Sequence, residues 1–558
     1  MPDAPLVWRL PTLLFTILCG AALAWFPQDG RPFWEIMRWD DQTTFPVFLA
    51  IALTLFLPVA PWERHDQFLT SIDKHPGIFS SALFACLAGL APWIYHGKPL
   101  STDEYLLWFQ AHSFAQGSLF ASYPPEWLPH IFGADELFIA DWKQGLLLSP
   151  YWPGFSLLLA PFSAIGLPWL CNPAIVGLSA YVLWLISHEL FDDPRARGLT
   201  LLLATASSAF FFNGVTFYAM PAHLLFNAIF AWLLLRPNAP RAFLAGVIGS
   251  FALVLHNPLP HLLFALPWIA WLAVTKAKQT MLPLITGYVP LTLLLGVGWV
   301  LLRLSSACSA TCASASHAFE QSGATLSAAG SFGTSAFTLP NWEILEWRSA
   351  GTVKLWLSSV PGLVVLACVT AKYRREAPFR LFAASGLATF LGYFFIPFDQ
   401  GFGWGNRYFH SAWLVLPLLA TAAIARGHTH HASTSAADLY RLSRAACLSV
   451  LLLFPDKGFV MLLYATEHWK QLPPHQGTQD EIVFKNGIGH WPLFLAQNPP
   501  YLSGAPTVFL SRGRKRDSEF IAKFFPRATL AGGNGYGTTY RVPPDERPGV
   551  LLNQFRDR

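Results

Sequence analysis

"MLPLITGYVPLTLLLGVGWVLL", residues 281–302, contains no charged side chain. A helix needs about 20 mainly apolar residues to cross the hydrocarbon core of a bilayer, so this stretch is long enough to span a membrane. Gly77–Ile94 and Thr200–Phe217 meet or approach the same length with the same apolar character. Repeated segments of this kind predict a chain that crosses a membrane several times.

The composition of the whole chain leads to the same class. Of its 558 residues, 53% are hydrophobic and 12% are charged, whereas ordinary soluble domains carry about 25% charged residues. We therefore expect an all-α polytopic membrane protein with about thirteen transmembrane helices. The expected spans lie near residues 8–26, 45–62, 77–96, 170–191, 198–217, 221–235, 241–256, 260–275, 281–302, 352–371, 379–397, 408–425 and 445–465.

Short loops rich in lysine and arginine indicate the orientation. The sequences "DDPRARG", "RPNAPR", "KAKQ", "KYRREAPFR" and "ARGHTHH" fall on one side of the membrane if the expected spans alternate. Such loops face the cytoplasm. The N-terminus is then cytoplasmic and the C-terminus periplasmic, with outer loops at 97–169 and 303–351. These loops also explain the net charge of +5, so we expect no nucleic-acid partner.

Three regions follow from this layout. Residues 1–76 should form two N-terminal transmembrane helices and a cytoplasmic loop, residues 77–465 the membrane core, and residues 466–558 a small soluble α/β portion outside the membrane. In the last region, "PTVFLSR" and "GTTYRVP" have strand patterns, and "DSEFIAKFF" has a helix pattern.

Cys308 and Cys312 stand apart from the other cysteines, because "CSATC" lies in an expected outer loop. A local disulfide in an oxidising periplasm and two free thiols are both compatible with this spacing. A zinc site is poorly supported there, since His317 is the one further ligand nearby.

Two adjacent carboxylates, Asp103 and Glu104, stand near the start of "STDEYLLWFQAHSFAQGSLF" at residues 101–120. The apolar residues that follow recur at helical spacing, which predicts an amphipathic helix just outside the third span. Ser101, Thr102 and Asp103 are good helix-starting residues, and acidic residues are favoured in a first turn. Helix capping alone can therefore explain the pair, and a catalytic role is the alternative.

The neighbours of this pair favour the catalytic interpretation. An apolar span, the Asp-Glu start of an outer helix, "QGSLF" at 116–120 and "YWPGFSLLLAPF" at 151–162 occur in this order. Together they resemble the first outer loop of the C-type glycosyltransferases, the GT-C superfamily. The closest resemblance is to the dolichyl-phosphate-mannose protein mannosyltransferase family and the bacterial aminoarabinose transferases. It covers roughly residues 77–425, although two spans precede Asp103 here where the family usually has one.

A second stretch, "GFGWGNRYFHSAWLVLPLLA" at residues 401–420, strengthens the resemblance. It is similar to the glycine-rich, aromatic stretch that precedes a late span in many polyprenyl-phosphate-sugar transferases. Arg407 offers a planar donor fork for a phosphate, and Tyr408 follows it. An arginine that reaches lipid headgroups from the aromatic belt is the alternative interpretation.

The resemblance implies an integral transferase of the bacterial inner membrane that moves a sugar from polyprenyl phosphate to an acceptor on the periplasmic side. It implies Asp103 as the general base, Arg407 as the clamp on the leaving phosphate and inversion at the anomeric carbon. Glu104 is then a neighbour on another face of the helix. No cofactor is required; relatives divide on metal use, and no D-x-D pair is obvious. The acceptor, whether lipid, glycan or protein, stays open.

Polar residues in two expected outer segments are further candidates for substrate binding. "LHNPLPHLL" at residues 255–263 contains His256 and His261, and "FYAMPAHLL" at residues 217–225 contains Tyr218 and His223. The prolines make a structural turn the simpler interpretation. Contact with a sugar or a phosphate is the alternative for His256, His261, Tyr218 and His223.

Two other classes of function compete with a glycosyltransferase. A transporter or flippase of a lipid-linked glycan would favour internal repeats and charged groups deep within the spans. The middles of the expected spans are nearly free of charge, and the sequence shows no repeat. A non-catalytic scaffold would leave Asp103 and Arg407 replaceable. The glycosyltransferase is therefore the preferred hypothesis.

Overall fold

The computed structural model of the chain describes residues 6–27, 31–59, 63–132, 139–141, 143–275, 277–303, 338–369, 376–426, 432–490 and 492–556. The disulfide candidates Cys308 and Cys312 lie outside these residues. The chain divides into two compact units. The helical unit comprises Met1–Ile94, Asn172–Leu293 and Ala336–Leu462, and the mixed unit comprises Tyr95–Cys171, Leu294–Ser335 and Leu463–Arg558.

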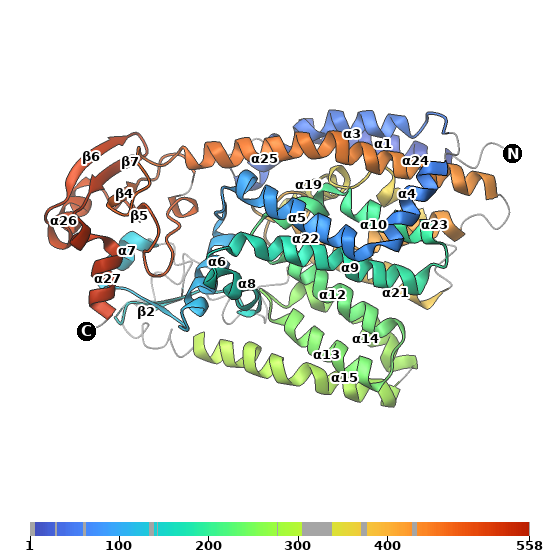
Figure 1. Cartoon of the computed structure of the whole chain (residues 1–558), viewed down its shortest axis with the longest axis horizontal. Coiled ribbons are helices and arrows are strands. Elements are labelled where there is room, and N and C mark those ends of the chain that lie inside the picture. Colours follow the sequence, from blue (N-terminus) through green and yellow to red (C-terminus); the bar gives the residue numbers. More distant parts are fainter. Residues whose placement is uncertain are drawn as a thin grey trace. The chain divides into compact units, whose positions relative to one another are not determined.

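Helices make up the described part of the helical unit (Figure 1). Counting the helices that begin or end at its borders, they are α1 (Leu6–Trp25), α2 (Pro32–Ile36), η1 (Met37–Asp41), α3 (Gln42–Thr54), α4 (Glu63–Lys74), α5 (Pro76–Tyr95), α9 (Cys171–Leu190), α10 (Pro194–Thr205), α11 (Ser208–Phe212), η4 (Asn213–Val215), α12 (Met220–Leu235), α13 (Ala239–Leu253), α14 (Leu259–Thr275), α15 (Ala277–Leu291), η5 (Thr292–Val297), α19 (Trp342–Leu357), α20 (Leu363–Val369), α21 (Ala377–Gly392), η7 (Tyr393–Phe395), α22 (Arg407–His410), α23 (Val415–Arg426), α24 (Ala432–Leu448), η8 (Ser449–Leu453) and α25 (Phe454–Trp469). Small residues allow close packing between them. On α13, a Cβ at Gly246 would lie 2.1 Å from the Leu284 carbonyl oxygen of α15, which is how glycine brings two membrane helices together.

Several of the described helices suit a membrane. Five are long and apolar enough to cross it: Val7–Trp25, Pro76–Tyr95, Pro168–Leu190, Gln279–Arg303 and Ala436–Trp469. Shorter apolar helices accompany them, at Gly154–Ala164, Met220–Leu235, Ala239–Leu253, Leu259–Thr275 and Val415–Ala425. The structure confirms the expected class, a polytopic α-helical membrane protein.

Three of the expected spans are broken, one of them at residues 408–425, where α22 ends at His410 and α23 begins at Val415. The prediction of one helix over residues 352–371 is wrong, because α19 ends at Leu357 and α20 begins at Leu363. Gly362 lies in this break with a φ of +95°, which residues with a side chain rarely adopt. The expected span at 198–217 consists of Pro194–Thr205 and Ser208–Val215, which meet at a bend of 63°.

The mixed unit combines short elements of residues 97–169, the loop that the sequence predicts to lie outside the membrane, with the C-terminal portion. The loop elements are α6 (Thr102–Ala115), β1 (Ala121–Ser122), η2 (Pro125–Trp127), α7 (Leu128–Ile131), β2 (Ile139–Asp141), β3 (Leu146–Leu148), α8 (Gly154–Ala164) and η3 (Pro168–Leu170). The C-terminal elements are β4 (Glu481–Lys485), η9 (Pro492–Phe494), β5 (Thr507–Leu510), α26 (Arg514–Phe524), β6 (Thr529–Asn534), β7 (Gly537–Arg541), η10 (Pro544–Glu546) and α27 (Pro548–Arg556). Strands β5 and β7 and helix α26 occur where the sequence predicts them.

The C-terminal strands form one four-stranded sheet in the order β5-β4-β7-β6. β4 pairs with β5 in parallel and with β7 antiparallel. Every residue of β4 and β5 is buried, as expected for strands that are covered on both faces.

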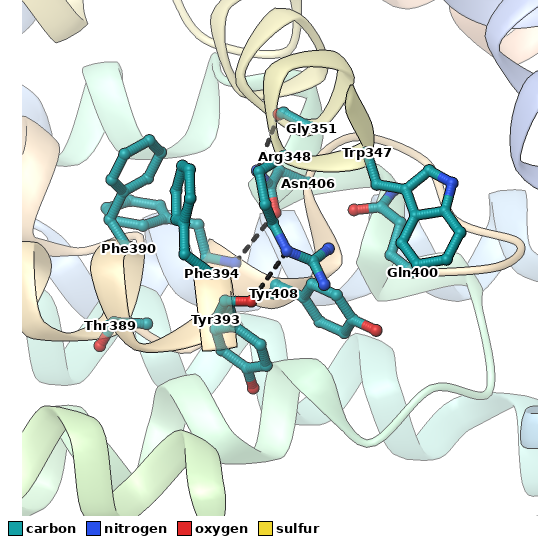
Figure 2. Close-up of a pocket in the computed structure, with 11 residues that line it drawn as sticks. Trp347, Arg348, Gly351, Thr389, Phe390, Tyr393, Phe394, Gln400, Asn406 and Tyr408 are labelled. Atoms are coloured by element: carbon teal, nitrogen blue, oxygen red, sulfur yellow. Dashed lines mark hydrogen bonds between the residues drawn. The ribbon is translucent and has the colours of Figure 1, made fainter. Parts of the chain in front are cut away.

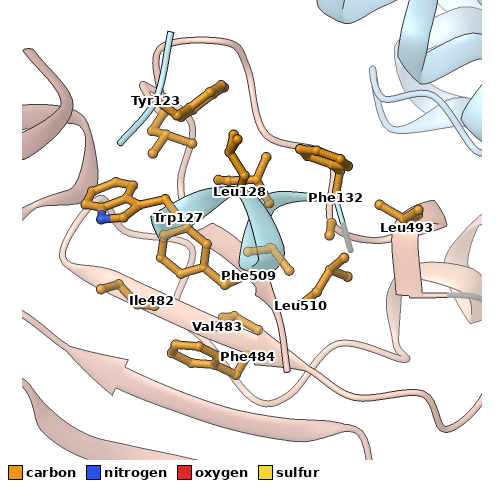
Figure 3. Packing of buried hydrophobic residues seen from close by; sticks show 14 of the residues in the cluster. Tyr123, Trp127, Leu128, Phe132, Ile482, Val483, Phe484, Leu493, Phe509 and Leu510 are labelled. Carbon is orange, nitrogen blue, oxygen red and sulfur yellow. The ribbon is translucent and has the colours of Figure 1, made fainter. Parts of the chain in front are cut away.

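Aromatic residues from the segment 97–169 cover this sheet (Figure 3). Trp127 and Phe132 belong to one buried cluster with Phe484 of β4 and Phe509 of β5. The ring centroids of Trp127 and Phe509 lie 5.8 Å apart in an edge-to-face arrangement, which is favourable for aromatic pairs. The loop and the C-terminal sheet therefore share one hydrophobic core.

Two ion pairs are completely buried in the helical unit. The Lys354 ammonium of α19 lies 2.5 Å from Asp41, and the Lys457 ammonium of α25 lies 2.9 Å from Asp40. All four side chains have no exposed surface. Of these residues, Lys457 alone lies in the middle of an expected span, at 445–465, and each of the four charges is balanced by its partner.

We predict that Asp41→Asn destabilises the protein by about 3–5 kcal/mol, because it leaves the Lys354 charge buried without its counterion. The double variant Asp41→Asn with Lys354→Met should recover most of this loss, since it removes both charges. Thermal unfolding of the purified protein in detergent measures the effect.

The matched control is Lys470→Met, which breaks the exposed pair with Glu467. Exposed pairs contribute about 0–1 kcal/mol, so its unfolding temperature should match the wild type. A double variant as unstable as Asp41→Asn would show that the buried pair does not act through charge balance.

Candidate functional site

The two carboxylates of the Asp-Glu pair have different surroundings. Glu104 is fully buried, and its Oε2 accepts hydrogen bonds from Leu100 N, Ser101 N and Ser101 Oγ, each at 3.1 Å. The Ser101 hydroxyl in turn accepts from Glu104 N, which completes a capping box at the start of α6. Helix capping therefore explains the presence of Ser101 and Glu104.

Asp103 instead lies half-buried on another face of α6. Its Oδ1 accepts a hydrogen bond of 2.5 Å from the Tyr151 hydroxyl. The indole nitrogen of Trp299 donates to the Tyr151 carbonyl oxygen at 2.9 Å. A tyrosine held at both its ends therefore fixes the orientation of a carboxylate that keeps some contact with solvent.

His112, the histidine of α6, is engaged with its own helix. Its Nδ1 lies 2.9 Å from the Trp108 carbonyl oxygen, and its ring packs on the Trp108 ring. Burial lowers the pKa of His112 below its usual value, with the Trp108 carbonyl opposing the shift.

An apolar groove of about 550 Å³ adjoins Trp299. Its walls come from the C-terminal end of α6 and the turn after it, from α8, and from the C-terminal end of the long helix Gln279–Arg303. The residues that line it are Phe114, Gly117, Ser118, Leu119, Pro153, Leu157, Leu294, Leu295, Gly298, Trp299 and Leu302. Such a surface fits a hydrocarbon chain.

Arg303 ends the same long helix. Its side chain is 1% exposed, and Nε, Nη1 and Nη2 all lack a hydrogen-bond partner within the described part of the chain. It follows Trp299 by four residues, so the two side chains share one face of the helix. A buried guanidinium without a partner is unfavourable by itself, which points to an anion at this place.

Arg407 has a different environment in the helical unit. Its Nη1 donates to the carbonyl oxygens of Gln400 and Phe402 at 2.6 and 2.7 Å. Its guanidinium lies 4.0 Å from the centre of the Tyr218 ring, within the range of a cation–π contact. The structure therefore brings together Arg407 and Tyr218, two of the residues that the sequence singles out.

The loop before α22 is shaped around this arginine. Gly401 and Gly405 have φ values of +59° and +85°, which glycine adopts without strain. A Cβ at Gly403 would lie 2.3 Å from Cδ of Arg407. Asn406 caps α22 by accepting from Phe409 N. The glycines of this stretch thus allow the loop to wrap the arginine side chain.

Arg348 of α19 binds residues 393–398, which precede this loop (Figure 2). The sequence analysis does not select this arginine. It donates to the carbonyl oxygens of Tyr393, Ile396 and Phe398 at 2.8, 2.9 and 2.5 Å. Its guanidinium lies over the Tyr408 ring at 4.7 Å, and that ring stacks on Tyr393. These side chains surround a cavity of about 20 Å³, which has room for about one water molecule.

Burial changes the pKa values of two side chains in and beside this loop. It lowers the pKa of Arg348 and raises the pKa of the Asp399 carboxyl relative to their usual values. The Tyr408 hydroxyl donates to the Asp399 carbonyl oxygen at 2.6 Å. Tyr408 therefore helps to hold the loop as well as lying beside Arg407.

The two histidines of residues 255–263 differ from each other. His261 has both ring nitrogens engaged, with Asn227 Oδ1 and the Tyr288 hydroxyl, each at 2.7 Å. His256 Nδ1 lies 2.8 Å from the side-chain nitrogen of Asn257. The arrangement of His261 is that of a satisfied core histidine.

The described residues contain no group of three or more His, Cys, Asp or Glu side chains that could hold a metal ion. The side chains that the sequence analysis missed are Tyr151, Trp299, Arg303 and Arg348. Tyr151 and Trp299 lie in stretches quoted from the sequence. Arg303 directly follows the apolar residues 281–302, but an arginine at the end of a span is common, so its position gives no signal of its own.

Two solved structures have a similar fold. The crystal structure of ArnT from Cupriavidus metallidurans bound to undecaprenyl phosphate aligns with a TM-score of 0.51 and 12% sequence identity, over 84% of this chain and 98% of that chain. The same protein in the apo state gives a TM-score of 0.50 and 12% identity, over 84% and 99%. No protein-family model and no curated protein match the chain. The likeness confirms the GT-C-like polytopic fold that the sequence resemblance implies.

We predict opposite effects on stability for the two buried arginines. Arg303→Met removes a charge without breaking a protein hydrogen bond among the described residues, so the free energy of unfolding should stay equal or rise by about 1–3 kcal/mol. Arg348→Met leaves three loop carbonyls without their donor and should lower the free energy of unfolding by about 1–3 kcal/mol. Thermal unfolding of the ligand-free protein compares them.

Each variant serves as the control for the other, since both delete a buried guanidinium. A marked loss of stability in Arg303→Met would mean that its charge is compensated within the protein, and the anion site would then be abandoned.

Proposed function

We propose that the protein is a membrane glycosyltransferase that transfers a sugar from a polyprenyl-phosphate donor to an acceptor hydroxyl on the periplasmic side of the bacterial inner membrane. The observation that carries the proposal is the half-buried Asp103, held by Tyr151 in a unit that also contains an apolar groove and the open Arg303 guanidinium. The fold likeness to a protein crystallised with undecaprenyl phosphate supports the choice of donor.

Asp103 is the general base in this proposal. The acceptor oxygen attacks the anomeric carbon, the bond from that carbon to the phosphate oxygen breaks, and the acceptor proton moves to the Asp103 carboxylate. Polyprenyl phosphate leaves with the bonding electrons. Attack from the face opposite the leaving group inverts the anomeric centre. Glu104 takes no part in this step, because its carboxylate is fully buried in the helix cap.

Two arginines are able to stabilise the leaving phosphate. Arg303 is the stronger candidate, because its three guanidinium nitrogens have no hydrogen-bond partner among the described residues. Arg407, the candidate from the sequence, already donates through Nη1 to two loop carbonyls. We therefore assign Arg407 first to the loop, with Tyr218 and Tyr408 beside it, and assign the phosphate clamp to Arg303.

The groove gives the polyprenyl chain a binding surface. Its lining is almost wholly apolar, and Trp299 in its wall is the residue that holds the Tyr151 carbonyl. A chain of isoprene units in the groove would place its phosphate end at the end of the helix that carries Arg303. The acceptor, whether lipid, glycan or protein, stays open, and no cofactor is required by this chemistry.

Transport of a lipid-linked glycan is the alternative function, and the buried charges of the helical unit are the observation that favours it. Asp40, Asp41, Lys354 and Lys457 nevertheless form two balanced ion pairs without exposed surface. Paired charges of this kind hold helices together and need no transported ligand. They therefore support transport less than Asp103 and Arg303 support sugar transfer.

We predict that Asp103→Asn lowers the turnover number by about 10²–10⁴-fold, because the asparagine amide cannot accept the acceptor proton. Its dissociation constant for the donor should be unchanged. Arg303→Met should instead weaken donor binding about tenfold or more, since a charge-assisted hydrogen bond to phosphate is lost. Sugar transfer from synthetic polyprenyl-phosphate sugars by purified protein in detergent measures both.

Glu519→Gln is the matched control, because Glu519 is an exposed carboxylate on α26. It should leave turnover and donor binding as in the wild type. Full turnover in Asp103→Asn would rule out the base. Absence of transfer by the wild type with every donor, together with movement of labelled donor across proteoliposomes, would establish transport instead.

A further inference from the structure

Tyr151 forms hydrogen bonds through three of its atoms. Its hydroxyl donates to Oδ1 of Asp103 at 2.5 Å, its carbonyl oxygen accepts from the indole nitrogen of Trp299 at 2.9 Å, and its backbone nitrogen donates to Ser149 Oγ at 3.3 Å. All four residues belong to the mixed unit. The place of the Tyr151 hydroxyl, and with it the orientation of the Asp103 carboxylate, therefore depends on Trp299 and Ser149.

Trp299 is at the same time part of the wall of the apolar groove. Its buried side chain lines the groove beside Phe114, and the two ring centroids lie 5.9 Å apart in an edge-to-face arrangement. An indole combines a large apolar surface with a single N–H donor. In Trp299 the apolar surface lines the groove, and the N–H binds the Tyr151 carbonyl oxygen.

A second connection between the groove and Tyr151 runs through Gln110 of α6. The Gln110 side chain is buried, its Nε2 donates to the Leu119 carbonyl oxygen at 2.9 Å, and its Oε1 accepts from Ser149 N at 3.0 Å. Leu119 also lines the groove, and Ser149 accepts from Tyr151 N. The backbone of Tyr151 is therefore linked to the groove at its nitrogen as well as at its carbonyl oxygen.

A hydrocarbon chain in the groove would restrain Trp299. The groove has a volume of about 550 Å³, which is within the roughly 300–1,000 Å³ of sites that hold small molecules. A chain that fills it packs on the indole, and these contacts stabilise the rotamer that the chain meets there. That rotamer is the one that donates to Tyr151. Filling the groove therefore also stabilises the hydrogen bond to Tyr151.

The orientation of the carboxylate is the step at which this restraint affects the reaction. A general base must lie within hydrogen-bond reach of the proton that it accepts, and a displacement of about 1 Å lowers a rate about 100-fold. Binding energy from parts of a substrate that do not react is used to hold the reacting groups in place, so truncated substrates lose turnover as well as affinity. The polyprenyl chain is such a part of the donor.

We propose that Trp299 is a positioning residue that links occupancy of the groove by the donor's hydrocarbon chain to the orientation of Asp103, and that it acts through Tyr151. The inference rests on the proposed function, in which Asp103 is the base and the donor is a polyprenyl-phosphate sugar. It adds that the enzyme selects a long apolar chain at the level of turnover. A donor whose chain leaves the groove empty meets a base that is less well oriented.

The test measures turnover and donor affinity of the full-length protein in detergent with two donors that carry the same sugar. One has a long polyprenyl chain, and the other has a single isoprene unit. The turnover number of the wild type should be about tenfold or more higher with the long chain. Trp299→Phe keeps an aromatic ring in the groove wall but removes the indole N–H. It should lower turnover with the long chain to the level of the short chain, while turnover with the short chain and the affinity for both donors stay nearly unchanged.

Tyr151→Phe provides a second readout of the same link. It removes the hydroxyl that binds Asp103, so turnover should fall with both donors to one common value. Because Trp299 acts through Tyr151, the double variant Trp299→Phe with Tyr151→Phe should lose no more turnover than Tyr151→Phe alone. Two residues that supported the reaction independently would instead show additive losses.

Two control variants separate this role from other effects. Trp342→Phe makes the same exchange at an indole of α19 that is 83% exposed, and it should keep the wild-type ratio of the two turnover numbers. Leu157→Ala shortens an apolar side chain in the groove wall. It should weaken binding of the long-chain donor about tenfold and keep the wild-type turnover at saturation, because the Trp299 N–H is still present.

Three results would overturn this inference and leave the transferase in place, since sugar is transferred in each of them. Equal turnover of the wild type with both donors would show that the chain does not orient the base. An equal loss with both donors in Trp299→Phe would mean that Trp299 holds Tyr151 whether or not the groove is filled. Weaker binding of the long-chain donor at unchanged turnover in that variant would leave Trp299 as groove wall only. Absence of transfer by the wild type with both donors would overturn the proposed function and this inference with it.

Discussion

A bilayer provides no hydrogen-bond partners, so a chain in it must satisfy its polar groups from within. Helices do this for most of the backbone. In the loop at residues 393–402 of the helical unit, side chains supply hydrogen bonds to the backbone. Arg348 donates to three carbonyl oxygens of residues 393–398, and Arg407 donates to two of residues 400–402. The same constraint pairs Lys354 with Asp41 and Lys457 with Asp40.

Because buried polar groups need partners within the protein, a buried group that lacks one is informative. All three guanidinium nitrogens of Arg303 are buried without a hydrogen-bond partner among the described residues. Unsatisfied polar groups cost stability, and in an enzyme that cost is offset when a ligand binds. A guanidinium suits a phosphate, which is the charged part of the donor that we propose.

The Asp-Glu pair shows how two adjacent carboxylates come to have different surroundings. Consecutive residues of a helix point about 100° apart. Glu104 therefore turns back to the backbone of Leu100 and Ser101, while Asp103 turns outward to Tyr151. Helix capping therefore explains Glu104 but not Asp103, and the catalytic role that we propose concerns Asp103 alone.

The sequence by itself determined the membrane class, most helix positions, two of the C-terminal strands and the choice of Asp103 and Arg407 as candidates, because apolar length, periodicity and helix-start residues are local properties. Only the tertiary structure decided which polar groups are satisfied. Tyr151 and Asp103 form a hydrogen bond although they are 48 residues apart in the sequence, and Arg348 and the Phe398 carbonyl oxygen do so at a separation of 50. The break at Gly362 likewise depends on packing against Trp8. Contacts at such separations leave no local pattern, so the open guanidinium of Arg303 becomes visible only once the chain is folded.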